Sequence, residues 1–261
     1  MVTVFGGEND RLYQVVIEGI NTICFEKEST KKALPYIGYS LGGDGSRLGN
    51  ANWLIKSTGW SHPGYVWIDR WLADMKNAEI LEIGPGFGLM SYAFLKLYPH
   101  ISISWMIFGD ENKIELADNG YEKGLRKVKN AFEEGRINYF FGRIERDNKI
   151  SNTFDVILMT EVFEHFALNP VKTLERIKTL LRPGGRLLLT TPNWGHLPTF
   201  NSWKELPEND ETEEQRYLEL LRCGHVYQYS KSELDDIFSD AGLKIEKYEV
   251  SESNNHNYLL Y

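Results

Sequence analysis

The sequence predicts an α/β fold with a doubly wound, Rossmann-like sheet of seven mostly parallel strands. Three observations predict it. Short β-rich runs alternate with amphipathic helices across residues 78–192, as βαβ units do. A glycine-rich turn follows the first of these runs. The helices also have recognisable start and stop signals, so local and global patterns agree on one architecture.

The strands and helices follow in order along the chain. Apolar and β-branched runs predict strands at 78–83, 101–108, 138–141, 154–159 and 186–191, with two more near the C-terminus. Apolar residues three and four apart predict helices at 90–97, 114–132 and 171–181. Asn169-Pro170 begins the third of these, and residues 182–185 end it. Ser230 and Glu233 form a capping-box pattern before a last helix, which Gly242 ends.

Two segments lie outside this pattern. Residues 1–77 form an N-terminal extension, with a helix behind Asp10, and residues 78–261 form the main domain with an insertion at 193–230. An aromatic segment of the extension leaves two interpretations open. Its rings either form part of a lid or pack against the sheet: Trp60, His62, Tyr65 and Trp67.

Composition excludes several classes of partner. The 261-residue chain has a formal net charge of -8 and no dense Lys/Arg run, which argues against nucleic acid. Its two cysteines, Cys24 and Cys223, show no metal-ligand spacing, and this favours a reducing compartment. The N-terminus does not resemble a signal peptide, and no apolar run approaches a membrane span. We therefore expect a cytoplasmic protein without a membrane partner.

The glycine-rich turn carries the first chemical signal. Residues 82–88 read Glu82-Ile83-Gly84-Pro85-Gly86-Phe87-Gly88. A dinucleotide fingerprint would place its third glycine at position 89, where the chain has Leu89, which disfavours a nicotinamide oxidoreductase. The turn instead resembles motif I of the class I S-adenosylmethionine (SAM)-dependent methyltransferases. That resemblance implies that these residues bind the methionine half of SAM, with Glu82 helping to hold the ammonium group.

Three further segments resemble the same family in the same order. Residues 154–166 are similar to its strand-four motif, residues 181–193 to its strand-five motif, and residues 225–243 to the C-terminal segment of its small-molecule branch. This branch includes ubiquinone-pathway O-methyltransferases and sugar and natural-product methyltransferases. The resemblance implies SAM as cofactor and S-adenosylhomocysteine (SAH) as product, with Met159 and Thr160 facing the methionine moiety. The sequence Thr160-Glu161-Val162-Phe163 replaces the Asn/Asp-Pro-Pro-aromatic motif of nucleic-acid amino-methyltransferases.

Two positions depart from the family pattern. Phe108 stands where the family has an acidic residue that binds both ribose hydroxyls. We expect Asp110, after Gly109, to replace that carboxylate; the alternative is that Asp110 only caps the following helix. Arg143 stands where an Asp often meets the adenine amine. We expect Glu145 or the backbone of Ile144 to take that part.

Candidate catalytic residues follow the strand ends. Methyl transfer to oxygen benefits from a general base, and histidine suits neutral pH. The candidates are His165 after strand four, His196 after strand five and His225 before the last helix, each of which also has a structural interpretation. Glu161 lies four residues before His165, so it would share a face with His165 if a helix begins there. No metal site is expected, because the sequence shows no third ligand beside this pair.

The sequence therefore favours methyl transfer from SAM to a hydroxyl of a small polar metabolite, such as a nucleotide-linked sugar. One alternative is a non-catalytic scaffold of the same fold, suggested by Phe108 and Arg143. The other is a nicotinamide oxidoreductase. The oligomeric state has no signal in the sequence.

Overall fold

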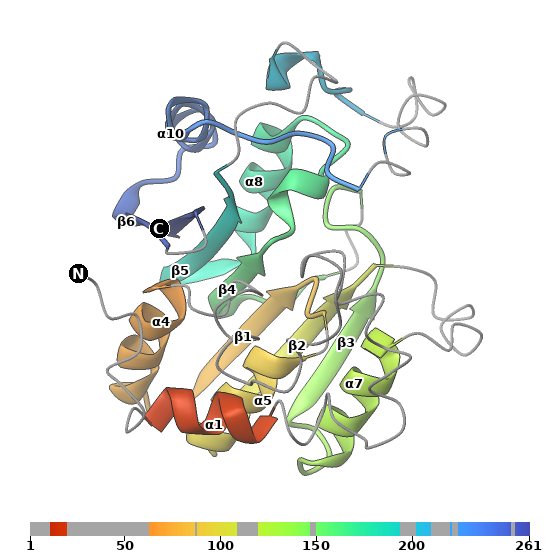
Figure 1. Ribbon diagram of the computed structural model, residues 1–261, viewed down its shortest axis with the longest axis vertical. Helices are drawn as coiled ribbons and strands as arrows, with labels where there is room; N and C mark the ends of the chain where they lie inside the picture. The colour runs from red at the N-terminus through yellow and green to blue at the C-terminus, as the bar shows by residue number, and fades with distance from the viewer. Residues whose placement is uncertain are drawn as a thin grey trace, which may run out of the picture.

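The computed structural model contains the predicted seven-stranded sheet (Figure 1). It describes residues 11–19, 63–86, 88–108, 120–146, 150–193, 202–209, 220, 224–251 and 254–261. The strand order is β3-β2-β1-β4-β5-β7-β6. Strands β1 to β5 pair in parallel, and β7 is antiparallel to β5 and β6. The strands are β1 Ala78–Ile83, β2 Ile101–Ile107, β3 Ile137–Phe141, β4 Phe154–Thr160, β5 Leu181–Pro192, β6 Ile245–Val250 and β7 Asn255–Leu260.

Helices cover both faces of the sheet (Figure 1). One face carries α1 Arg11–Gly19, α4 Pro63–Ala73, α5 Leu89–Leu97 and α7 Gly120–Asn130. The other carries α8 Pro170–Thr179 and α10 Lys231–Asp240. Two short 3-10 helices, η2 Phe163–His165 and η3 Trp203–Glu205, follow β4 and β5. None of the described helices is long and apolar enough to cross a membrane.

Alternation within the strands divides the core into two layers. Ile80 of β1 joins the cluster beneath α1, α4, α5 and α7, whereas its neighbour Leu81 joins the cluster beneath α8 and α10. Val156 and Ile157 divide in the same way on β4. Because successive side chains point to opposite faces, a strand buried on both faces must be apolar throughout. This explains the continuous apolar runs in the sequence.

Most of the predicted boundaries are confirmed. The Asn169 side chain accepts from the backbone N–H of Val171 and begins α8. Ser230 and Glu233 form the predicted capping box of α10, and Gly242 follows the last helical turn with φ of 69°. The break expected at residues 182–185 lies within β5, between the residues that pair with Phe154 and Val156. The expected helix end is therefore wrong: α8 ends at Thr179, and Leu181 and residues 182–185 belong to β5, which bulges there.

The described parts of the N-terminal extension pack on the main domain. In α1, Leu12 is buried and Arg11 donates to the Leu97 carbonyl over 2.6 Å. In α4, the Tyr65 ring is buried, 6.3 Å from that of Phe94. Packing against the sheet is therefore the interpretation that the structure gives for Tyr65 and for the half-buried Trp67. Trp60 and His62 lie outside the described residues, and the domain boundary at residue 77 stays a prediction.

Candidate functional site

The strand order reverses between β1 and β4. From β1 the chain continues to β2 on one side, and from β4 to β5 on the other. The crevice at the carboxyl ends of two such strands is where open α/β sheets bind ligands. Here the loops that meet at this edge begin at Gly84, after β1, and at Glu161, after β4.

The glycine-rich turn requires its glycines. Gly84, Gly86 and Gly88 have φ values of 67°, 54° and 74°, a region that L side chains rarely adopt. A Cβ on Gly84 would also lie 2.7 Å from a methyl carbon of Val162, in the loop after β4. The spacing at alternate residues therefore reflects one tight turn of left-handed backbone, placed against the neighbouring loop. Phe87 lies outside the described residues.

Glu82 lies buried beneath this turn. Ser91 of α5 donates to its carboxylate, and Trp105 Nε1 donates to Ser91 Oγ over 2.7 Å. Burial raises the pKa of Glu82 to about 7, although the hydrogen bonds from Ser91 and Trp105 act in the opposite direction. Ser91 and Trp105 therefore hold the Glu82 side chain where β1, β2 and α5 meet.

The two departures from the family pattern are in contact. Phe108 follows β2 directly, and 65% of its surface is exposed. The guanidinium carbon of Arg143 lies 4.3 Å from its ring centroid. Gly109 and Asp110 lie outside the described residues, so the replacement of the ribose carboxylate by Asp110 stays a prediction.

The two groups expected at the adenine amine already hold protein partners. Glu145 is buried, and its Oε1 accepts from the backbone N–H groups of Ala167 and Leu168 over 2.7 and 2.8 Å. The carbonyl of Ile144 accepts from Arg176 over 2.9 Å. Both groups therefore join the loop after β3 to α8 and to the segment before it.

At the end of β4, Met159 is buried and Thr160 Oγ1 accepts from the hydroxyl of Tyr65 over 2.9 Å. Glu161 follows with a φ of 55°, and its Oε1 accepts from Thr190 over 2.8 Å. The α-helix that would have placed Glu161 on the face of His165 is not present, because only the 3-10 helix η2 forms here. His165 instead contacts Glu164 and a later segment that includes Gly224 and His225.

That later segment brings His225 to His165. The two rings lie edge to face with centroids 5.0 Å apart. His165 Nδ1 is hydrogen-bonded to the Gly224 carbonyl, and its Nε2 lies 3.8 Å from Glu164 Oε1. The backbone carbonyl of Glu164 accepts from the Val226 N–H over 2.7 Å, which ties the two segments together. His196 lies outside the described residues.

Burial controls the charges of this group. It raises the pKa of Glu161 to about 7 and that of Glu164 well above the ordinary value, where the charge on Glu161 adds to the effect. It lowers the pKa of His165 and of His225. The neighbouring His225 lowers the pKa of His165 further. At neutral pH both imidazoles are therefore neutral and able to accept a proton or bind a cation.

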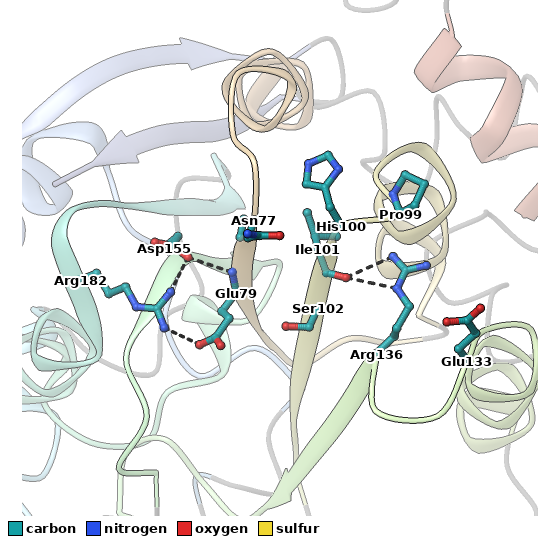
Figure 2. A pocket seen from close by; sticks show the side chains of 11 residues that line it. Asn77, Glu79, Pro99, His100, Ile101, Ser102, Glu133, Arg136, Asp155 and Arg182 are labelled. Carbon is teal, nitrogen blue, oxygen red and sulfur yellow. Dashed lines mark hydrogen bonds and ion pairs between the residues drawn. The ribbon is translucent and has the colours of Figure 1, made fainter.

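A separate pocket of about 390 Å³ lies at the opposite edge of the sheet, where β1 and β2 begin (Figure 2). Its arginines hold protein partners: Arg182 forms ion pairs with Glu79 and Asp155, and Arg136 donates to the Ile101 carbonyl. These pairs join neighbouring strands, and the pocket is remote from the glycine turn.

A glycine turn at the reversal point of a Rossmann-like sheet, with carboxylates and imidazoles at the next strand end, defines a nucleotide-cofactor-binding α/β protein. A family model described as a methyltransferase domain matches residues 67–248. The chain therefore belongs to the methyltransferase domain family, which confirms the resemblance to class I SAM-dependent methyltransferases. No curated protein matches the chain.

Solved structures share this fold at low identity. A SAM-dependent methyltransferase from Aquifex aeolicus is 15% identical, with a TM-score of 0.50 over 75% of this chain and 88% of that one. The mitomycin 7-O-methyltransferase is 18% identical, with a TM-score of 0.52 over 97% and 73%. An O-methyltransferase from neocarzinostatin biosynthesis, in complex with SAH and 1,4-dihydroxy-2-naphthoic acid, is 16% identical, with a TM-score of 0.50 over 95% and 70%.

Sequence reasoning missed three residues of the candidate site. Ser91 and Trp105 form the network around Glu82, and Glu164 lies against His165. Glu164 had a detectable signal, since it directly precedes a candidate histidine. Ser91 and Trp105 have none, because their positions depend on which helix crosses which strand. Tyr65 was singled out with the aromatic segment, but its hydrogen bond to Thr160 was not predicted.

Proposed function

We propose that the chain transfers a methyl group from SAM to a hydroxyl of a small polar metabolite. The oxygen forms a bond to the methyl carbon while the carbon–sulfur bond breaks, and that electron pair stays on sulfur to give SAH. The hydroxyl proton passes to a base at the end of β4. Positioning the two reactants accounts for much of the acceleration of such an in-line transfer.

The observation that carries this proposal is the turn of three left-handed glycines above Glu82 at the reversal point of the sheet. In our assignment residues 83–86 and Gly88 contact the methionine half of SAM. The Glu82 network faces its ammonium group, and Met159 and Thr160 line the far side. Asp110 bonds the ribose. Glu145 and Ile144 shape the adenine end through the loop they hold.

The acceptor side contains the candidate bases. His165 and His225 offer neutral imidazoles, and Glu161 offers a half-buried carboxylate at the end of β4. His196 keeps the same proposed role from its place after β5. We assign acceptor specificity to residues 1–77 and 193–230, and we place the protein in the cytoplasm. The choice of a nucleotide-linked sugar rests on the family resemblance.

A non-catalytic scaffold is the second candidate, since Phe108 removes the usual ribose carboxylate. Titration calorimetry with SAM and SAH separates the two functions. We expect micromolar binding to the wild type that weakens markedly in Asp110→Ala and is lost in Gly84→Ala.

Gly135→Ala is the matched control for the glycine variant, because Gly135 also has a positive φ, 87°, with nothing near its Cβ position. It should bind SAM as the wild type does. Absence of SAM binding by the wild type would make the scaffold the better conclusion. Product mass spectrometry that finds the methyl group on nitrogen or carbon would overturn the hydroxyl assignment.

A further inference from the structure

We propose that Glu164, His165 and His225 form a binding site for a divalent transition-metal ion of the zinc class. Each residue offers one ligand atom, and the three atoms lie within 4.8 Å of one another. Two imidazoles and a carboxylate are a common protein ligand set for catalytic zinc. No third ligand beside His165 could be recognised in the sequence, because His225 is 60 residues away and only the fold brings it near.

The ligand atoms are close to the spacing that a metal ion needs. Three atoms 4.8 Å apart have a common centre about 2.8 Å from each, whereas zinc bonds to nitrogen and oxygen are about 2.0–2.2 Å. Each atom must therefore move inward by less than about 1 Å, which side-chain rotation provides. Three protein ligands leave a further coordination position for a water or an oxygen of the acceptor.

The surrounding hydrogen bonds hold two of the ligands in orientations that favour metal binding. His165 Nδ1 is bonded to the Gly224 carbonyl, so Nε2 faces Glu164 Oε1 with its lone pair. Metal-bound histidines characteristically donate their second N–H to a carbonyl or carboxylate. Glu164 Oε2 accepts from Thr191 over 3.0 Å, which fixes that carboxylate in turn. Oε1 is therefore the oxygen of Glu164 that would bind the ion.

Burial supports the same assignment. Glu164 is 1% exposed. Burying a carboxylate without a compensating charge is costly, and buried charges in proteins are paired or bind metals. Among the described residues, His165 and His225 have ligand atoms close enough to share one ion with Glu164.

The role of the ion rests on the proposed function, although its binding does not. An acceptor hydroxyl bound to the ion would lose its proton more readily, and its oxygen would attack the methyl carbon as the carbon–sulfur pair stays on sulfur. In that arrangement the two histidines hold the ion, and Glu161 is the candidate base that remains at the end of β4.

The test uses the full chain, first dialysed against a chelator. Cobalt(II) chloride is titrated and followed by visible absorption, and zinc chloride is then added in competition. We expect one cobalt ion per chain, displaced by zinc. Affinity should fall by more than about 100-fold in His165→Ala and His225→Ala, and by about 10- to 100-fold in Thr191→Val, which removes only a supporting bond.

His100→Ala is the matched control, because it removes an exposed imidazole at the opposite edge of the sheet and should leave cobalt affinity unchanged. Circular dichroism verifies that each variant is folded. A wild type that binds no cobalt, or variants that bind it equally well, would overturn the site.

SAM titration and methyl-transfer assays of the same samples separate this inference from the proposed function. Cobalt bound at these residues in a protein that transfers no methyl group would support the site and remove its proposed role. Full transfer by a metal-free wild type that binds no cobalt would overturn the site and leave the function standing.

Discussion

The Arg143 guanidinium lies over the face of the Phe108 ring, 4.3 Å from its centroid. These are the two positions at which the chain departs from the family pattern, and they depart together. An aromatic ring can contact a guanidinium through its negative face. This contact therefore joins the two departures at the edge where the adenosine half of SAM is proposed to bind.

The exposed ring of Phe108 predicts a stacking role. We expect Phe108→Ala to weaken SAM binding by about 10-fold, because stacking of a base on an aromatic side chain contributes about 1–3 kcal/mol. Titration calorimetry measures this. Tyr139→Ala is a matched control, since Tyr139 is also exposed and has Lys129 over its ring at 4.7 Å. Tighter binding by Phe108→Ala would mean that the ring obstructs the site.

The buried carboxylate of Glu82 predicts a pH dependence of stability. Its pKa is about 7 in the folded chain and 4.5 ordinarily, so the folded state binds more protons between these values. The free energy of unfolding should therefore fall as pH rises from about 4.5 to 7, by up to about 1.4 kcal/mol per pH unit from this group. Glu82→Gln should remove the contribution of one titrating group to the change of the unfolding free energy with pH. It should also raise stability at pH 8.

Urea unfolding at several pH values tests the Glu82 prediction. Glu133→Gln, which removes an exposed carboxylate, should leave the slope as in the wild type. An unchanged slope in Glu82→Gln would contradict the assignment. Glu161 also has a pKa near 7, so a residual slope of the same sign is expected to remain.

The hydroxyl of Tyr65 connects α4 to the end of β4. Tyr65→Phe removes its hydrogen bond to Thr160 and should cost about 1 kcal/mol of stability. If Thr160 lines the methionine site, SAM binding should also weaken, by about 10-fold. Tyr92→Phe removes a comparable bond to Glu18 of α1 and should reduce stability without affecting SAM binding. Equal SAM affinities in the two variants would place Thr160 outside the site.

Local sequence patterns predicted much of the fold. The capping box at Ser230 and the cap at Asn169 are set by neighbouring residues, and the structure confirms both. Local patterns were wrong at β5, which takes in Leu181 and the residues expected to end α8, and after β4, where a 3-10 helix forms. The glycine spacing was likewise readable, because left-handed backbone can be inferred from residue type.

The sequence by itself determined the strand and helix periodicity, the glycine turn and the family. Only the tertiary structure decided that Phe108 meets Arg143, that Ser91 and Trp105 surround Glu82, and that His225 reaches Glu164 and His165. The physical reason is range. Periodicity, capping and left-handed turns depend on residues within one or two helical turns, whereas these contacts depend on how strands distant in the chain pair and which helices pack across them.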